Sequence, residues 1–166
     1  YVEFPLYECD MAQWLAGTDA RPPPPYPDVF AAVHDVLRAV EHMHRAKVIH
    51  CDIRPKNVFM KQRLGRASPS GAGSWQAILA DFDVSLDSGA RATLLQTRTQ
   101  GGARGFEGLL TMAPEVRPPS CQSCTPASDM FSFGGLLFAA FYPEIQPEMV
   151  SEMVSASGDV VVREHE

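Results

Sequence analysis

A short polar segment, VIHCDIRPKNVFM at residues 48–60, holds the side chains of this chain that are best suited to chemistry. His50 is followed two residues later by Asp52, and Asn57 comes five residues after that aspartate. β-Branched and aromatic residues flank the polar stretch on both sides, although Asp and Asn are poor strand formers. The pattern predicts a polar loop held between two buried apolar segments, and loops positioned in this way often carry binding or catalytic residues.

Short strands are predicted around this loop. Residues 58–60 and 77–80 are strand candidates, and the second ends at Asp81-Phe82-Asp83. The low-complexity residues 63–74 between them predict a flexible surface insertion. Residues 1–7 are interpreted as the end of another strand running into a connector. Residues 84–112 show no periodicity and are predicted to be a functional or mobile loop. The polar loop would therefore lie between two strands joined by a variable connection.

Three helices are predicted. Residues 10–16 form a short candidate, and a long amphipathic helix is expected to begin after Asp28 as its cap and to end near Lys47. Residues 129–142 are apolar on all sides, which predicts a helix buried on every side. The histidines of the long helix could be metal ligands, but no carboxylate or cysteine lies at a spacing that would complete a metal site. We therefore interpret them as ordinary helix residues. They are His34, His42 and His44, and the predicted buried face is Val29, Val33, Val36, Leu37, Val40 and Met43.

Length and composition exclude several classes of protein. The 166 residues suit one domain or a large part of one, and 45% apolar with 20% charged residues is typical of a folded globular chain. A net charge of −6 gives no support to nucleic-acid binding, and no apolar run reaches the length of a membrane span. We expect an intracellular, cytoplasmic protein, and the first residues suggest a piece of a longer chain.

The four cysteines are too few and too scattered for a disulfide framework. Cys121 and Cys124 have the spacing of metal ligands, but no second pair completes a tetrahedral site. We interpret them as loop thiols in a reducing compartment, with a metal-binding protein as a remote alternative.

Three separated motifs now occur in order along the chain. They are the segment from His50 to Asn57, Asp81-Phe82-Asp83, and Ala113-Pro114-Glu115. Together they resemble the H-R-D-x-x-x-x-N, D-F-G and A-P-E set of the eukaryotic protein kinases. The sequence SDMFSFGGLLF, with Asp129 at its start, resembles the buried central helix of the kinase C-terminal lobe. The resemblance covers nearly all of residues 1–142.

The resemblance implies an α+β kinase-like fold, of which this chain is the mainly α-helical C-lobe part with short β-strands around the catalytic loop. Residues 1–142 would be a partial kinase domain comprising the hinge and the C-lobe, without the N-lobe. Residues 143–166 would be a C-terminal remainder of uncertain structure.

The resemblance also implies a role for each site residue. Asp52 would sit beside the attacking hydroxyl, and Asn57 and Asp81 would be oxygen ligands of Mg²⁺. Arg54 would place a cation near the γ-phosphate of ATP, and Phe59 would lie under the adenine. His50 and Phe82 resemble members of the stacked column that supports the catalytic loop.

Two functions follow from these roles. The first is an ATP-dependent protein kinase that transfers the γ-phosphate to a protein hydroxyl, as a partial domain that is inactive alone. Because Pro55 is retained between Arg54 and Lys56, the pattern favours Ser/Thr over Tyr specificity. The alternative is a pseudokinase or truncated kinase-like scaffold that binds a protein partner.

Several positions depart from the kinase pattern. Cys51 replaces the Arg that precedes the catalytic Asp, which argues against switching by activation-loop phosphorylation but is compatible with catalysis. Asp83 replaces the Gly of D-F-G, and Ala103 stands where a Thr is usual; these two positions and the missing N-lobe favour the alternative. No G-x-G-x-x-G strand and no V-A-x-K strand occur in the chain. We further expect Glu115 to lack its usual Arg partner and the helix at residues 129–142 to expose an apolar patch.

Overall fold

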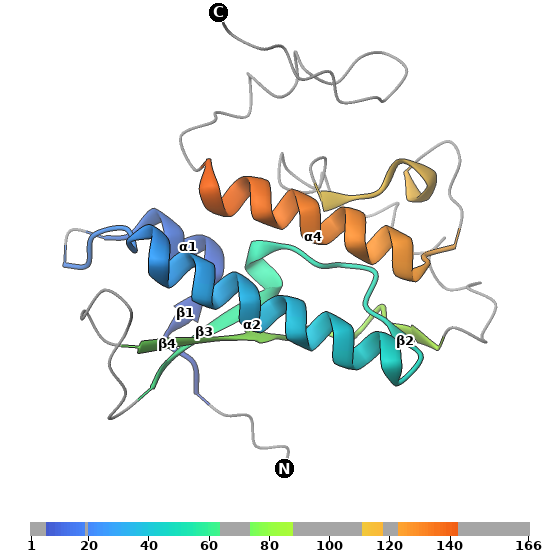
Figure 1. Ribbon diagram of the computed structural model, residues 1–166, viewed down its shortest axis with the longest axis horizontal. Helices are drawn as coiled ribbons and strands as arrows, with labels where there is room; N and C mark the ends of the chain where they lie inside the picture. The colour runs from blue at the N-terminus through green and yellow to red at the C-terminus, as the bar shows by residue number, and fades with distance from the viewer. Residues whose placement is uncertain (1–5, 19, 64–73, 88–110, 118–122, 143–166) are drawn as a thin grey trace, which may run out of the picture.

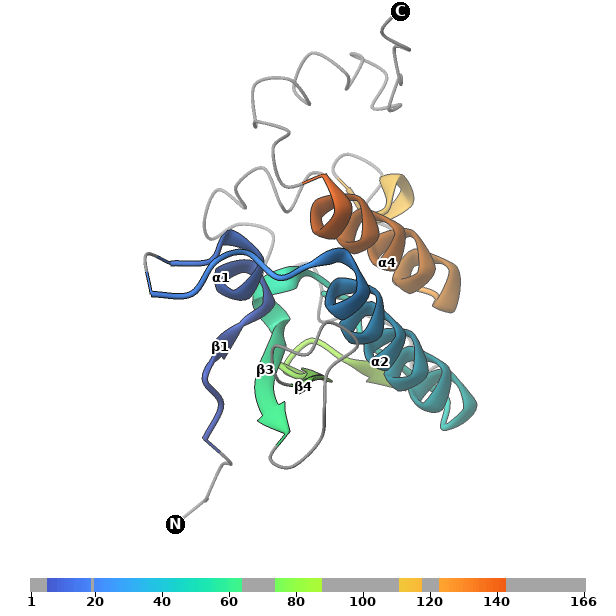
Figure 2. The same cartoon turned by 60° about the vertical axis from the view of Figure 1, so that its left-hand side comes forward.

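The computed structural model describes residues 6–18, 20–63, 74–87, 111–117 and 123–142. Its main helices are α1 (Met11–Ala16), α2 (Tyr26–Arg45) and α4 (Pro126–Phe141). Figures 1 and 2 show α2 between α4 on one side and the strands β3 and β4 on the other. The structure thus contains helices and a small antiparallel sheet, as a kinase-like fold requires.

The strands form two small antiparallel sheets. The larger has the order β1-β3-β4 and consists of β1 (Cys9–Asp10), β3 (Val58–Arg63) and β4 (Ser74–Leu79). The smaller pairs β2 (Val48–Ile49) with β5 (Leu86–Asp87). In β3 and β4, Val58 lies opposite Leu79, and the amide of Ala80 donates to the carbonyl of Asn57 at 2.9 Å. The start of β3 and the end of β4 therefore lie at one edge of the sheet.

The strand predictions for residues 58–60 and 77–80 are confirmed, and both strands extend further into the predicted insertion, of which residues 64–73 lie outside the described part. Leu6 and Tyr7 are not in a strand, which agrees with the connector predicted there, and β1 begins at Cys9; residues 1–5, where the strand end was predicted, are not described. β5 lies within the stretch where no periodicity was visible, since two residues are too few to show a period.

The core lies between α2, α4 and the sheet. Five of the six positions predicted for the inner face of α2 are buried, but Leu37 is 38% exposed. Leu37 follows the fully buried Val36, and one residue turns the side chain by about 100° around the helix. Leu37 therefore lies at the edge of the apolar stripe.

Helix α2 begins earlier than the sequence suggests. Its first residue is Tyr26, its N-cap is Pro25, and Asp28 lies buried in the first turn and is not the cap. Pro27 explains the difference, because its fixed φ suits the first turn of a helix. The helix ends at Arg45, close to the expected end, and Lys47 then adopts a left-handed φ of 63°.

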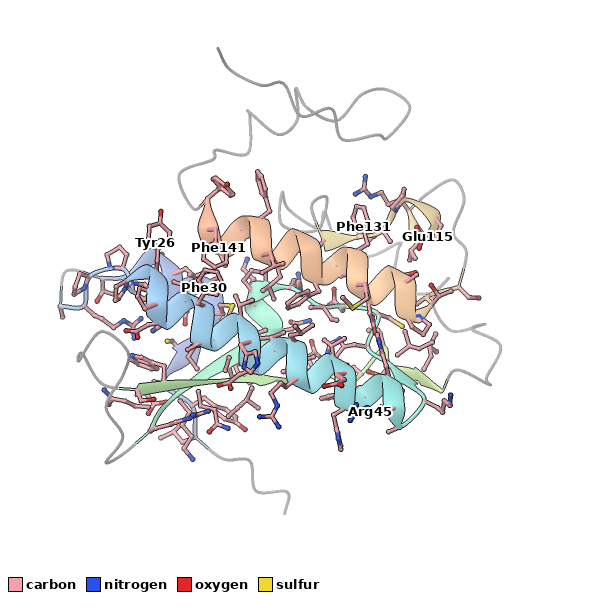
Figure 3. The ribbon with its side chains drawn as sticks, in the orientation of Figure 1. Tyr26, Phe30, Arg45, Glu115, Phe131 and Phe141 are labelled. Carbon is pink, nitrogen blue, oxygen red and sulfur yellow. The ribbon has the colours of Figure 1, made fainter. Side chains whose placement is uncertain are left out.

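Helix α4 runs antiparallel to α2, so that the end of one lies against the start of the other. Figure 3 shows Tyr26 and Phe30 of α2 beside Phe141 near the end of α4. Phe141 lies 6.2 Å from the Tyr26 ring and 5.0 Å from the Phe30 ring, centroid to centroid. These aromatic contacts hold one end of the helix pair.

The start of α4 contradicts the prediction of burial on every side. Thr125 and Ser128 form a capping box at its N-terminus, and Ser128 and Asp129 are buried. Met130 and Phe131 are instead 45% and 38% exposed. The polar side of the first turn therefore faces the protein, and the hydrogen bonds of Asp129 described below explain why.

No helix in the described part of the chain is both long and apolar enough to cross a membrane.

Candidate active site

The carboxylate of Asp129 joins α4 to the polar loop. Its Oδ1 accepts from the amide of Cys51 at 2.9 Å, and its Oδ2 accepts from the amide of His50 at 2.9 Å. Oδ2 also lies 2.8 Å from Nε2 of His44, near the end of α2. Asp129 is fully buried, and three donors offset the cost of removing its carboxylate from water.

His50 holds the other side of the loop. Its Nε2 lies 3.0 Å from the carbonyl of Ala80, and its Nδ1 lies 3.3 Å from the amide of Asp52. Nε2 must donate to the carbonyl, and Nδ1 must accept from the amide, so the ring is the neutral Nε2–H tautomer. Burial lowers the pKa of His50 from its ordinary value of 6.5, although the bond to Ala80 and three nearby carboxylates oppose that shift.

Cys51, between His50 and Asp52, has a φ of 69°. A residue with a Cβ rarely adopts this left-handed conformation, which costs of order 1–3 kcal/mol. The adjacent bonds to Asp129 hold the loop in this shape. The strained turn sets the direction in which the following residue, Asp52, leaves the loop.

The structure brings together Asp52, Arg54 and Asn57. The side-chain Nδ2 of Asn57 donates to the backbone carbonyl of Asp52 at 2.8 Å and to the Oδ2 of Asp52 at 2.9 Å. The Nε of Arg54 lies 3.4 Å from the same Oδ2, close enough for an ion pair. Because both N–H groups of the buried Asn57 side chain point at Asp52, its Oδ1 must face away from that carboxylate.

Asp81 lies near this cluster through the geometry of the sheet. Asn57 immediately precedes β3, and Asp81 comes two residues after the end of β4. The bond between Ala80 and Asn57 brings the two segments to one sheet edge. Asp81 is exposed and has a φ of 67°, a conformation that Asp tolerates better than most residues.

Two aromatic contacts surround the loop. The ring of His50 lies 4.9 Å from that of Phe82, so the predicted neighbours of the supporting column do touch. Phe59 stacks nearly parallel on Tyr7, with ring centroids 5.1 Å apart. Tyr7 was not singled out from the sequence, since its contact depends on the pairing of β1 with β3.

Glu115 has a partner that the sequence did not suggest. Its Oε1 accepts from the hydroxyl of Ser128 at 2.8 Å, a partner other than the arginine that is usual in the kinase family. Figure 3 shows Glu115 close to the start of α4 and to Phe131. The third motif is thus attached to the same helix turn that contains Asp129.

His44 is the main residue that the sequence interpretation missed. The sequence pattern predicts an ordinary helix residue at this position, but Nε2 of His44 lies 2.8 Å from Oδ2 of Asp129. A usable signal was Asp129 itself, a lone carboxylate in an otherwise apolar segment. Such a residue needs buried donors, and a histidine on the neighbouring helix can supply one.

No group of three or more His, Cys, Asp or Glu in the described ranges could hold a metal ion by itself. The side-chain oxygens of Asn57 and Asp81 are two hard donors at one sheet edge, which suits a cation that takes its other ligands from phosphates and water. Of the cysteine pair once considered for a metal, Cys124 is buried and Cys121 lies outside the described residues.

Known proteins that resemble this chain are protein kinases. The family described as protein kinase domain matches residues 24–154. Death-associated protein kinase dapk-1 of Caenorhabditis elegans is 31% identical over 104 residues, which are 63% of this chain and 6% of that protein. Serine/threonine-protein kinase KDX1 of Saccharomyces cerevisiae is 25% identical over 138 residues, 82% of this chain and 28% of that protein.

A third relative is eukaryotic translation initiation factor 2-alpha kinase gcn-2 of Caenorhabditis elegans. It is 24% identical over 152 residues, 81% of this chain and 9% of that protein. The chain therefore spans between 6% and 28% of the length of these relatives.

Asp129→Asn should loosen the polar loop. An amide presents one oxygen and an N–H₂ group to three donors, so at least one buried N–H loses its acceptor. We expect the free energy of unfolding to fall by roughly 2–4 kcal/mol. Hydrogen exchange should accelerate at the amides of His50 and Cys51. Asp35→Asn is the control, because Asp35 binds Arg63 and the amide of Ala77 at a different place. Equal exchange in both variants would contradict the role of Asp129.

The low pKa of His50 should make stability depend on pH. Below pH 6.5 the unfolded chain takes up a proton that the buried ring resists, so the unfolded state is favoured as pH falls toward the folded pKa. Unfolding in urea should show wild type losing stability relative to His50→Gln on going from about pH 7.5 to about 5.5. A difference that stays constant, or changes in the opposite direction, would show that the ring is not held neutral.

Proposed function

The chain belongs to the protein kinase domain family, and from that premise we propose that Asp52, Asn57 and Asp81 form the phosphoryl-transfer site of an ATP-dependent protein kinase. One observation carries the proposal: Asn57 donates to the Asp52 carboxylate while lying at the sheet edge that Asp81 follows. The proposed base, Asp52, and one proposed ligand, Asn57, come from the first motif, and the second proposed ligand, Asp81, follows the residue whose amide donates to the Asn57 carbonyl. Phosphoryl transfer needs this kind of positioning more than covalent chemistry.

Asp52 is proposed to accept the proton of the attacking hydroxyl. The side-chain Nδ2 of Asn57 donates to Oδ2 of Asp52 at 2.9 Å, and the guanidinium Nε of Arg54 lies 3.4 Å from the same oxygen. The backbone of Asp52 is held by His50, and its carbonyl accepts from Asn57. The carboxylate is therefore oriented before any substrate arrives, as general base catalysis requires.

Mg²⁺ is proposed to bind the side-chain oxygens of Asn57 and Asp81 together with the phosphates of ATP. The residues fit this ion: the Asn57 nitrogen is used by Asp52, which leaves its oxygen for a cation, and Asp81 is exposed at the adjacent position. When bound, such an ion neutralises charge on the phosphates.

Arg54 and Phe59 are proposed to contact opposite ends of the nucleotide. Arg54 is tied to Asp52 through Nε, and its terminal nitrogens can face a phosphate. Phe59 is a half-buried aromatic residue on β3, one residue beyond the start of the strand that follows Asn57. Its stacking on Tyr7 gives an aromatic surface suited to a flat base.

Ser/Thr specificity is proposed for the acceptor hydroxyl, which would belong to a protein. The support is the Arg54-Pro55-Lys56 sequence, in which Pro55 is buried and begins the 3₁₀ turn η1 (Pro55–Asn57). One relative is itself named a serine/threonine-protein kinase. We also propose that residues 1–142 are the hinge and C-lobe of the domain, with residues 143–166 as its C-terminal remainder, in a cytoplasmic protein.

A kinase-like scaffold that binds a protein partner is the second candidate. Exposed large apolar side chains on α4 and at its C-cap favour it, namely Met130 and Phe131 on the helix and Tyr142 at the cap. Such side chains are more typical of an interaction surface than of a solvent-facing helix. Mg²⁺-dependent ATP binding distinguishes the kinase from the scaffold, because a kinase requires it and a scaffold does not.

Asp81→Ala should weaken Mg²⁺-dependent ATP binding to this chain by at least about tenfold, because it removes one of two protein ligands. Titration calorimetry with and without Mg²⁺ would measure the effect. Asp83→Ala is a matched control two residues away and should change affinity much less. Equal losses in the two variants would contradict the assignment of Asp81, and no Mg²⁺-dependent binding by wild type would favour the scaffold.

The 166 residues alone should transfer no phosphate to a peptide, because the sequence contains no glycine-rich strand to cover the phosphates and no V-A-x-K lysine. Incubation with labelled ATP, Mg²⁺ and a serine-containing peptide tests this expectation. Labelling by wild type that disappears in Asp52→Asn would show that the chain is active on its own and that Asp52 is required.

A further inference from the structure

Two cysteines from distant parts of the sequence meet beside the polar loop. The side chain of Cys51 forms a hydrogen bond with that of Cys124. Cys51 also donates to the carbonyl of Ile49 at 3.7 Å, and no described cysteine is in a disulfide. The two sulfur atoms are therefore neighbours in a reduced pair.

Both cysteines are attached to the frame around Asp129. The amide of Cys51 donates to the Asp129 carboxylate, and the amide of Asp129 donates to the carbonyl of Thr125 at 3.2 Å. Cys124 directly precedes Thr125, the N-cap of α4. The approach of the thiols thus depends on two fixed backbone segments and not on chance contact between mobile side chains.

We propose that Cys51 and Cys124 form a reversible disulfide under oxidising conditions and so link the polar loop to the start of α4. The sulfur atoms are already in hydrogen-bond contact, and bond formation requires them to approach to about 2 Å. Cys9 is a poor competitor, because its sulfur accepts from Arg21 at 3.6 Å beside α1.

Hydrogen peroxide is the two-electron oxidant for this reaction. A thiolate of the pair attacks one oxygen of hydrogen peroxide, the O–O bond breaks, and hydroxide leaves and takes a proton to become water. The second thiol, on losing its proton, attacks the sulfenic sulfur; the S–S bond forms and a second water leaves. Two thiols are oxidised by two electrons, and one peroxide is reduced to two waters.

The surroundings of the two thiols slow their oxidation, so the reduced pair is the resting state. The hydrogen bond with Cys124 and burial both raise the pKa of the Cys51 thiol far above its ordinary value. Cys51 is half-buried and Cys124 is 6% exposed, so a small oxidant has limited access. Because the thiolate is the reacting form, oxidation should accelerate as pH rises.

The bridge would act on the proposed active site, a consequence that rests on the proposed function. Cys51 adjoins Asp52 and already has a strained φ of 69°. Pulling its sulfur toward Cys124 would shift the backbone that orients Asp52 relative to Asn57. The bridge itself does not depend on kinase activity and can be tested separately.

The test is to treat the reduced 166-residue chain with hydrogen peroxide, block free thiols with N-ethylmaleimide and map the peptides by mass spectrometry. We expect a linked peptide pair containing Cys51 and Cys124, two hydrogen atoms lighter than the separate peptides. It should disappear on treatment with dithiothreitol and form faster at about pH 8.5 than at about pH 7.

Variants check the assignment. Cys51→Ser and Cys124→Ser should each abolish the linked pair, whereas Cys9→Ser should leave it intact. Alkylation of both Cys51 and Cys124 after oxidation, or a dominant bond from Cys124 to Cys121, would overturn the proposal. Because wild-type mapping alone gives this answer, a variant that fails to fold does not affect the test. Absence of Mg²⁺-dependent ATP binding by the reduced chain would count against the proposed function and not against the disulfide.

Discussion

The arrangement of the site depends on one buried carboxylate, that of Asp129. It accepts from two amides of the polar loop and lies within hydrogen-bond distance of a histidine of α2, so a single carboxylate joins both segments to α4. A carboxylate in the first turn of a helix is also favoured by the helix dipole. Meeting these donors turns the polar side of α4 inward and leaves Met130 and Phe131 partly exposed. The orientation of α4 is thus set by hydrogen bonding in opposition to the simple burial of apolar surface.

The same interaction makes an otherwise unfavourable backbone possible. Three non-glycine residues have positive φ, namely Lys47, Cys51 and Asp81, among the residues that the structure describes. They lie where the chain leaves α2, where it turns into Asp52, and where it leaves β4. Each such conformation costs of order 1–3 kcal/mol unless its surroundings hold it. The hydrogen bond from the Cys51 amide to the Asp129 carboxylate restrains the backbone at Cys51. The hydrogen bond from the Ala80 amide to the Asn57 carbonyl restrains the backbone next to Asp81. Strain here is concentrated at the positions that direct Asp52 and Asp81.

Much of this could be predicted from the sequence, for physical reasons. The period of α2 shows in its apolar positions, and Asn57 and Asp52 are near in sequence, so their contact is local. The orientation of α4 could not be predicted, because apolar residues surround the helix and give almost no preferred direction. The contacts of His44 with Asp129 and of Tyr7 with Phe59 depend on long-range packing, which periodicity does not report. Leu37 is predicted to be buried but is 38% exposed, because the spacing of apolar residues does not define exactly where the buried face of a helix ends.

The substitution of Cys51 in the kinase motif can now be understood within this framework. The kinase motif usually has an arginine at this position, a side chain suited to binding a phosphate. Here the side chain faces another thiol, and a permanent charge at this place would lie beside the buried Cys124. The loop therefore remains ordered without the arginine, because its anchoring relies on backbone amides and not on the side chain of residue 51.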